Sequence, residues 1–256
     1  MPERIVTKGI VLRVTDTKEA DQILTVLTPQ GKLGVIARGA RRRGSRIAAS
    51  CQLLAFSELV LYERGGWSYL DEASTLALFD GVRQDVALLS LASYFAEMAE
   101  TVTAEEPDAG GVLPLLLNAL YALDTLHKPP EQVRAAYELA LLARTGYEPL
   151  LDGCAVCGKE QPDEPLLDAQ QGVLLCRACA GAPGAGLVPL CGGSLAAMRH
   201  ILHSDPKRML AFRLEGESLA RLSRACETFA AAQLDRGFRT LDFYKSFLTA
   251  QTPPER

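Results

Sequence analysis

The sequence lacks acidic residues over one long stretch, and it lacks long apolar runs altogether. No Asp or Glu occurs between Asp21 and Glu58. No apolar run approaches the roughly 18–20 residues that a membrane-spanning helix needs. The first residues, Met1–Arg4, show neither the basic nor the apolar region of a signal peptide. We therefore expect a cytoplasmic protein without a membrane partner.

The common motifs of catalysis are also missing. There is no Gly-rich phosphate loop ending in Lys-Ser/Thr and no Gly-x-Ser-x-Gly. Only 3 histidines occur, and the carboxylates do not cluster as a metal-dependent nuclease requires. His200 and His203, three residues apart, could bind a metal, but solvated or core histidines are the simpler interpretation. We expect no catalytic residues and no enzymatic activity.

The composition is that of a folded globular protein. Of the 256 residues, 48% are hydrophobic and 23% are charged, so the chain has ample material for a core. The net charge is −4. A basic stretch in an acidic chain indicates that one surface meets an anionic partner.

Five segments rich in Val, Ile, Leu and Thr occupy the first 80 residues. Turn residues separate some of them, at Pro29–Gly31 and at Gly65-Gly66. Five short strands predict a small barrel of the OB type, with an SH3-like barrel as the alternative that strand counting cannot separate. The predicted strands are Ile5–Val14, Gln22–Thr28, Lys32–Arg38, Leu53–Tyr62 and Trp67–Leu76.

After Gly81 the apolar spacing becomes helical. Pro130 suits the first position of a helix, Gly146 suits the end of that helix, and Ser194 suits an N-cap. We expect an α+β protein. Its predicted parts are an OB-fold domain at 1–80, an α-helical domain at 81–149 and 193–256, and an inserted zinc module at 150–192.

Two pairs of cysteines predict a metal site in that Gly- and Pro-rich module. Each pair has the spacing Cys-x2-Cys, and eighteen residues separate the pairs. Such knuckles place four sulfurs around one zinc ion, and four sulfurs leave no open position for a substrate, so the zinc should be structural. A redox pair or chance buried thiols are the alternatives. The predicted ligands are Cys154, Cys157, Cys176 and Cys179.

Three cysteines stand outside this pattern. Cys226 shares a predicted helix with Leu222 and Phe229, which indicates a core position. Cys191 is near enough in sequence to replace one of the ligands. Cys51 has no assigned role.

The acid-free stretch carries a basic arm after the third predicted strand. Arginines on a Gly-bounded loop can contact phosphates along a nucleic-acid strand while the barrel supplies a groove. The predicted contacts are Lys32, Arg38, Arg41, Arg42, Arg43 and Arg46. Aromatic residues that could stack on bases, or equally form the barrel core, are Phe56, Tyr62, Trp67 and Tyr69.

A second, weaker basic cluster lies near the predicted helix that follows the zinc module. It consists of Arg199, Lys207, Arg208 and Arg213. These side chains form a secondary candidate for contact with DNA, and a solvated helical surface is the alternative.

Several stretches resemble the RecO family of bacterial DNA repair proteins. The resemblance covers nearly the whole chain and is most specific at the N-terminus, and the paired cysteines match the zinc-bearing members. The stretches are Gly9–Arg13, Glu19–Thr28, Gly31–Leu33, Ala37–Arg42 and Phe238–Leu248.

The resemblance implies a recombination mediator. Such proteins bind single- and double-stranded DNA through the OB-fold and anneal complementary strands. With RecR they help to load RecA onto strands coated by the single-strand binding protein, whose acidic-apolar C-terminal tail is a further partner. The implied location is the bacterial cytoplasm, at the nucleoid during repair. A zinc-containing nuclease and an RNA-binding zinc protein are the alternatives.

Overall fold

The chain forms two compact units. The computed structural model describes residues 4–103, 111–181, 184 and 186–251. One unit comprises residues 1–125 and 238–256, and the other comprises 126–237. The sequence instead predicts three parts, a barrel, a helical domain and a zinc module. That division into domains stays a prediction.

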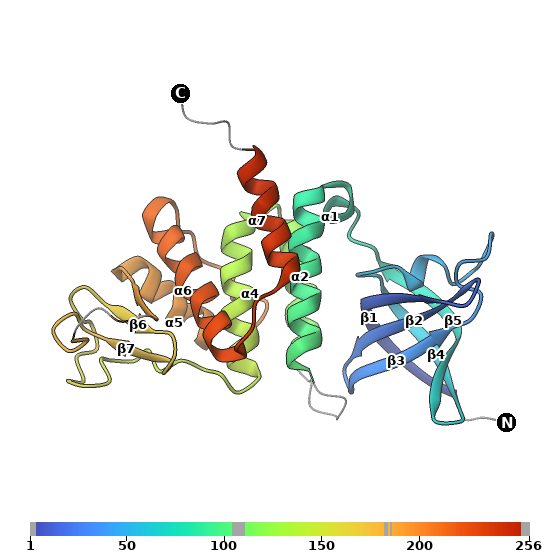
Figure 1. The fold of residues 1–256 in the computed structure, drawn as a ribbon, viewed down its shortest axis with the longest axis horizontal. Coiled ribbons are helices and arrows are strands. Elements are labelled where there is room, and N and C mark those ends of the chain that lie inside the picture. Colours follow the sequence, from blue (N-terminus) through green and yellow to red (C-terminus); the bar gives the residue numbers. More distant parts are fainter. Residues whose placement is uncertain (1–3, 104–110, 182–183, 185, 252–256) are drawn as a thin grey trace. The chain divides into compact units, whose positions relative to one another are not determined.

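The N-terminal unit begins with a closed five-stranded barrel (Figure 1). Neighbours around the barrel follow the order β1-β2-β3-β5-β4, and β4 pairs with β1 to close it. All pairs are antiparallel except β3 with β5, which is parallel. This order is that of the predicted OB type, so the fold class is confirmed. The strands are β1 (Arg4–Thr17), β2 (Asp21–Thr28), β3 (Gly31–Ala37), β4 (Phe56–Arg64) and β5 (Trp67–Ala77).

Glycines allow the barrel's tight turns and close crossings. Gly65 and Gly66 have φ values of 60° and 75°, which suit a two-residue hairpin whose strands twist in the right-handed sense. Gly9 lies where β1 crosses β2, and an added Cβ there would come within 2.5 Å of a Val26 methyl carbon. The barrel core is filled by inward-facing aliphatic side chains, among them Val11, Leu24, Val26, Val35 and Leu59.

Four α-helices complete the described part of the N-terminal unit. Asp85 caps α2 by accepting hydrogen bonds from two backbone N–H groups. The last helix, α7, packs against α2, where Tyr94 contacts Phe238 edge to face and Thr240 donates to a carboxylate oxygen of Glu97 at 2.6 Å. The helices are α1 (Asp80–Gln84), α2 (Val86–Val102), α3 (Val112–Asp124) and α7 (Arg239–Gln251).

Among its described residues, the second unit combines three α-helices with a small sheet of order β7-β6-β8. Inside it, Arg134 is 7% exposed. Its guanidinium contacts the fully buried carboxylate of Glu138 at 3.0 Å and the partly exposed carboxylate of Glu227 at 2.9 Å. The elements are α4 (Pro130–Arg144), β6 (Leu166–Asp168), β7 (Val173–Leu175), β8 (Leu187–Pro189), α5 (Gly192–His203) and α6 (Gly216–Leu234). No helix in the described ranges is long and apolar enough to cross a membrane.

The helix boundaries confirm two sequence predictions and correct a third. Pro130 opens α4, and Gly146 follows its end with a φ of 97°. The prediction that Ser194 is an N-cap is wrong, because α5 begins at Gly192 and its cap is Cys191. The Cys191 sulfur accepts from the Ser194 N–H, and the Ser194 hydroxyl accepts from the Cys191 N–H, so the two residues form a reciprocal capping box.

Candidate metal centre and nucleic-acid interface

Two short turns bring the four paired cysteines together. In the first, the Gly158 N–H donates to the Cys154 carbonyl at 2.8 Å. In the second, the N–H groups of Cys179 and Ala180 both donate to the Cys176 carbonyl. Gly158 and Gly181 have φ values of 74° and 66°, the left-handed conformation that lets each turn close behind its sulfurs.

The four sulfur atoms all lie within 4.8 Å of one another. Zn–S bonds of about 2.3 Å in a tetrahedron would place neighbouring sulfurs about 3.8 Å apart. The observed distance between the Cys157 and Cys176 sulfurs is 3.8 Å, and all four cysteines are free thiols rather than disulfides. The cluster therefore fits a metal ion, and it is the one group of three or more potential ligands found among the described residues.

Hydrogen bonds and mutual repulsion set the charge of these thiols. Backbone N–H groups, first that of Cys157, lower the pKa of the Cys154 thiol to about 6. Hydrogen bonds with neighbouring sulfurs, first that of Cys176, raise the pKa of Cys179 to about 12. A thiolate therefore disfavours ionisation of a second thiol at this distance. A bound divalent cation would offset the repulsion between the two negative charges.

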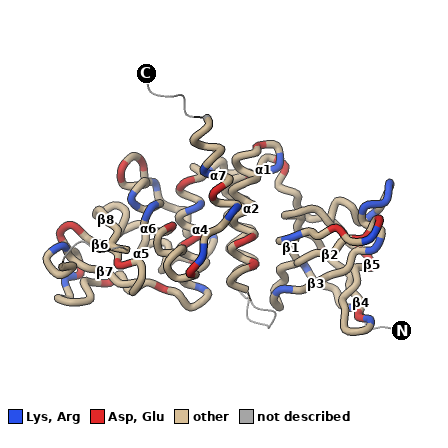
Figure 2. The backbone as a smooth tube through the Cα atoms, viewed as in Figure 1, with Lys and Arg blue, Asp and Glu red and all other residues tan. Residues whose placement is uncertain are grey.

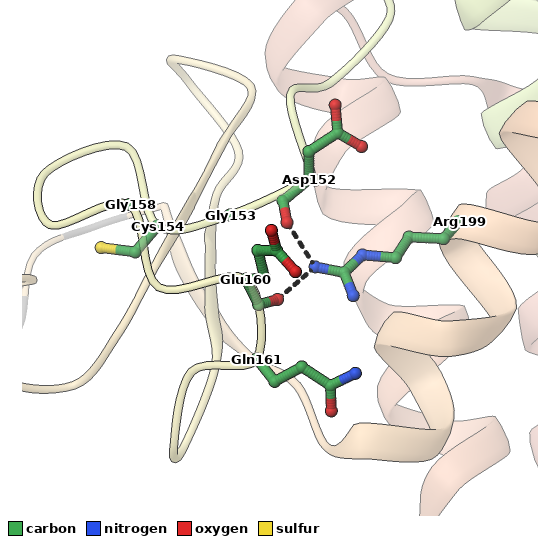
Figure 3. A pocket seen from close by; sticks show the side chains of 7 residues that line it. All are labelled: Asp152, Gly153, Cys154, Gly158, Glu160, Gln161 and Arg199. Carbon is green, nitrogen blue, oxygen red and sulfur yellow. Dashed lines mark hydrogen bonds between the residues drawn. The ribbon is translucent and has the colours of Figure 1, made fainter.

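The guanidinium of Arg199 ties the first cysteine turn to α5. It donates to the carbonyls of Leu151, Asp152 and Glu160 at 2.9, 3.0 and 2.6 Å. Figure 3 shows the last two of these bonds beside Cys154, in an open pocket of about 580 Å³. The guanidinium is thereby occupied in holding the cysteine segment in place.

The remaining cysteines and histidines lie outside the metal cluster. Cys226 is fully buried, as its helical pattern predicts. Cys191 caps α5 and is not one of the four clustered cysteines. His200 bonds the Arg208 carbonyl at 3.0 Å, and His203 lies 4.0 Å from a carboxylate oxygen of Asp152.

The basic arm leaves the barrel at the end of β3 and is fixed at its base. The Gly39 N–H donates to a carboxylate oxygen of Asp21 at 2.8 Å, and the Arg41 N–H donates to the Ala20 carbonyl at 3.0 Å. Figure 2 shows this Lys- and Arg-rich segment in blue at one end of the barrel. Sequence reasoning missed Asp21, whose only signal was its place just before the acid-free stretch.

The six predicted contacts of the arm differ in their surroundings. Arg42, Arg43 and Arg46 are exposed. Arg41 is also exposed and forms a loose ion pair with Asp16 at 3.4 Å. Lys32 is half-buried, and its ammonium donates to the Glu100 carbonyl at 2.9 Å.

Arg38 and the aromatic candidates lie on the outer side of the barrel. The guanidinium carbon of Arg38 is 4.6 Å from the centre of the Tyr69 ring. Tyr62 stacks on Tyr69, and Trp67 is exposed, whereas Phe56 is half-buried at the start of β4.

The four side chains of the secondary basic cluster also differ in their surroundings. Lys207 and Arg208 are exposed. Arg213 forms an exposed ion pair with Glu215 at 2.6 Å, and Arg199 donates to three carbonyls as described above. Lys207 and Arg208 therefore have the side chains best able to approach an anionic ligand.

Two family models match the chain and together account for most of it. The model described as Recombination protein O N terminal matches residues 1–79, which is the barrel. The model described as Recombination protein O C terminal matches residues 83–242. The second match alone covers more than half of the sequence.

Curated relatives are similar over nearly their whole length. The chain is 29% identical over 241 residues to a DNA repair protein RecO of Acetivibrio thermocellus, covering 94% of this chain and 96% of the relative. It is 30% identical over 251 residues to that of Symbiobacterium thermophilum, covering 95% and 97%. It is 34% identical over 223 residues to that of Heliobacterium modesticaldum, covering 84% and 80%. With both halves matched in order, the chain belongs to the RecO family of DNA repair proteins.

Proposed function

We propose that this protein is a recombination mediator that binds single- and double-stranded DNA through its barrel and anneals complementary strands. The observation that carries the proposal is the basic arm. Its arginines follow β3 on a loop that Asp21 and Ala20 hold at the barrel's edge. A fixed row of cations beside a rigid barrel suits the regularly spaced phosphates of a nucleic-acid strand.

Annealing follows from the same charge distribution. Two single strands repel each other through their phosphates, and a basic surface that binds both lowers that repulsion. Contacts to phosphates carry no direct information on base sequence, so binding should be nearly independent of sequence. The proposed contacts are Lys32, Arg38, Arg41, Arg42, Arg43 and Arg46, with Arg199, Lys207, Arg208 and Arg213 as the secondary set.

The metal site has a structural role in this proposal. One zinc ion would be held by Cys154, Cys157, Cys176 and Cys179, whose four sulfurs fill a tetrahedral coordination shell. Support comes from the sulfur–sulfur distance of 3.8 Å and from the small size of the surrounding sheet, whose strands have only three residues each. A sheet of such short strands gains stability from a bound metal ion.

The proposed partners follow from membership of the family. We propose that the protein acts with RecR to load RecA onto DNA coated by single-strand binding protein, and that it contacts the C-terminal tail of that protein. It acts in this proposal by binding rather than by catalysis, in the cytoplasm and at the nucleoid during repair.

Annealing of complementary oligonucleotides, with and without single-strand binding protein, tests the proposal. We expect annealing that persists in EDTA over the course of the assay and leaves the DNA uncleaved. Competition between RNA and single-stranded DNA separates this function from RNA binding. Absence of annealing, or robust DNA hydrolysis abolished by a point change in this chain, would contradict it.

A further inference from the structure

Two tyrosines form a stacked pair on the outer surface of the barrel. Tyr62 on β4 and Tyr69 on β5 are directly opposite in the antiparallel register. Their ring centroids are 5.3 Å apart and the ring planes differ by 15°. Their strand neighbours Leu61 and Leu70 are buried in the barrel core, so alternation along each strand directs the tyrosines outward.

Arginines flank the tyrosine pair on both sides. Arg4 on β1 is the register partner of Tyr62, and its guanidinium pairs with the Asp71 carboxylate at 2.6 Å. Arg38, just beyond β3, stacks on Tyr69 with 4.6 Å between its guanidinium carbon and the ring centre. The register therefore aligns Arg4 and the two tyrosines across β1, β4 and β5, and Arg38 adds a second cation beside Tyr69 from just beyond β3.

Trp67 extends this aromatic row toward solvent. It lies two residues before Tyr69 on β5, hence on the same face of the strand, and faces Arg64 across the Gly65-Gly66 turn. Trp67 is 53% exposed and is the only tryptophan of the chain. An indole left this open on the surface contributes little to the core.

A stacked tyrosine pair alone would only stabilise the sheet. Here the pair is continuous with the basic arm, since Arg38 belongs to both. Asp71, two residues after Tyr69 on β5, is paired with Arg4, and the exposed Glu63 follows Tyr62 on β4. Tyr62 and Arg38 cover the Tyr69 ring, so the open aromatic surface beside these guanidinium groups is that of Trp67. An open indole near guanidinium groups matches a ligand that carries both π faces and phosphates.

We propose that the exposed indole of Trp67 forms a platform on which an unpaired base of single-stranded DNA stacks, while Arg4, Arg38 and the arm hold the phosphates of the strand. This inference rests on the proposed function, because it assigns the bases of the same strand a place on the barrel. Stacking tolerates every base, and each stacked base contributes about 1–3 kcal/mol, or roughly five- to 150-fold in affinity.

Trp67 provides a direct measurement, because all tryptophan fluorescence of the protein comes from it. The full chain is titrated with a thymidine oligonucleotide of about 15 nucleotides and with an abasic strand of the same length, which keeps the phosphates and lacks the bases. The platform predicts quenching of Trp67 by the thymidine strand and binding at least about fivefold tighter than that of the abasic strand.

Conservative variants localise the effect. Replacing Trp67 by leucine (Trp67→Leu) keeps apolar surface and removes the ring face, and binding by this variant is followed through the fluorescence anisotropy of a labelled strand. It should bring thymidine binding down to the abasic level, with the dependence on salt unchanged. Tyr121→Leu is the matched control, since Tyr121 is 49% exposed on α3, away from the barrel surface; it should bind as the wild type does.

The outcomes separate the platform from the proposed function. Equal affinity of the wild type for the thymidine and abasic strands would overturn the platform and leave phosphate binding by the arm intact. This comparison needs no variant, so it decides the question even if the Trp67→Leu protein fails to fold. Binding of neither strand would overturn both proposals.

Discussion

A carboxylate oxygen of Asp21 accepts a hydrogen bond of 2.8 Å from the backbone N–H of Gly39. The bond joins the start of β2 to the base of the basic arm, 18 residues further along the chain. Gly39 has a φ of 65°, a conformation that favours glycine, so this link fixes the point at which the chain leaves the barrel. An acidic residue beside a proposed anion-binding surface thus has a structural reason to be there.

Replacement of Asp21 should loosen the arm. Asp21→Ala removes the acceptor of the Gly39 N–H and should cost about 1 kcal/mol of unfolding free energy. Asp21→Asn keeps an acceptor while removing the charge, so it separates the anchoring bond from simple electrostatics. We expect the Ala protein to bind single-stranded DNA more weakly than the Asn protein, as measured by fluorescence anisotropy. Equal affinities would show that the bond does not position the arm.

Removal of three arm charges should change the salt dependence of binding. Each phosphate contact on a single strand contributes about 0.7 to the slope of log affinity against log salt, so Arg41→Ala, Arg42→Ala and Arg43→Ala together should flatten it by about two. Annealing should fall in parallel. Lys207→Ala, Arg208→Ala and Arg213→Ala remove the same charge from the secondary set, and this variant is the comparison. A normal slope in the arm variant, with a reduced slope in the secondary-set variant, would make the secondary cluster the leading site.

Loss of the cysteine cluster should remove the metal. Elemental analysis of untagged protein under reducing conditions should find about one zinc per chain. Cys154→Ser with Cys157→Ser should abolish it and lower the melting temperature, by about 2–4 °C for each kcal/mol lost in a chain of this size. Cys191→Ser is the control and should retain the zinc, since Cys191 is outside the cluster. Zinc-free wild-type protein would refute the site.

Cys191 should ionise near neutral pH. Burial raises the pKa of its thiol, but hydrogen bonds with Ser194 and Ser218 outweigh burial and bring the pKa down to about 7, from an ordinary value of 9.0. Because the pKa of Cys191 is lower in the folded than in the unfolded protein, the ionised thiol stabilises the fold. This stabilisation is fully present above pH 9 and is lost as the pH falls through 7. Alkylation of Cys191, followed by mass spectrometry of its peptide, should therefore rise with a midpoint near pH 7, and Ser218→Ala should move the midpoint upward. A midpoint near 9 in the wild type would contradict this.

The buried pair of Arg134 and Glu138 should be costly to break from one side. Arg134→Met leaves the fully buried Glu138 carboxylate without its guanidinium partner, at an expected cost of about 3–5 kcal/mol of unfolding free energy. Adding Glu138→Leu should recover much of that loss, because the stranded charge is then gone. Urea unfolding of the two single variants and the double variant measures the coupling. Additive losses would mean that the two side chains do not stabilise each other.

The features that the sequence predicted are local ones. The spacing of Cys154 and Cys157 within one turn, and of Cys176 and Cys179 within another, limits where the sulfurs can lie. Alternation of apolar residues and glycine turns located the five strands to within a few residues. Pro130 and Gly146 marked the ends of a helix because their backbone preferences act at the residue itself.

Other features were decided by contacts between residues far apart in the sequence. The parallel pairing of β3 with β5, which identifies the OB order, depends on closure of the whole barrel. Ser194 has the chemistry of an N-cap, yet Cys191 takes that position because tertiary packing sets where α5 begins. Arg199 belonged to a basic cluster by composition, but the folded chain directs its guanidinium to three carbonyls. Tyr62 and Tyr69 could have been core or surface residues, and only the register and closure of the barrel place their rings side by side outside, because a shift of one residue along either strand would turn its tyrosine inward.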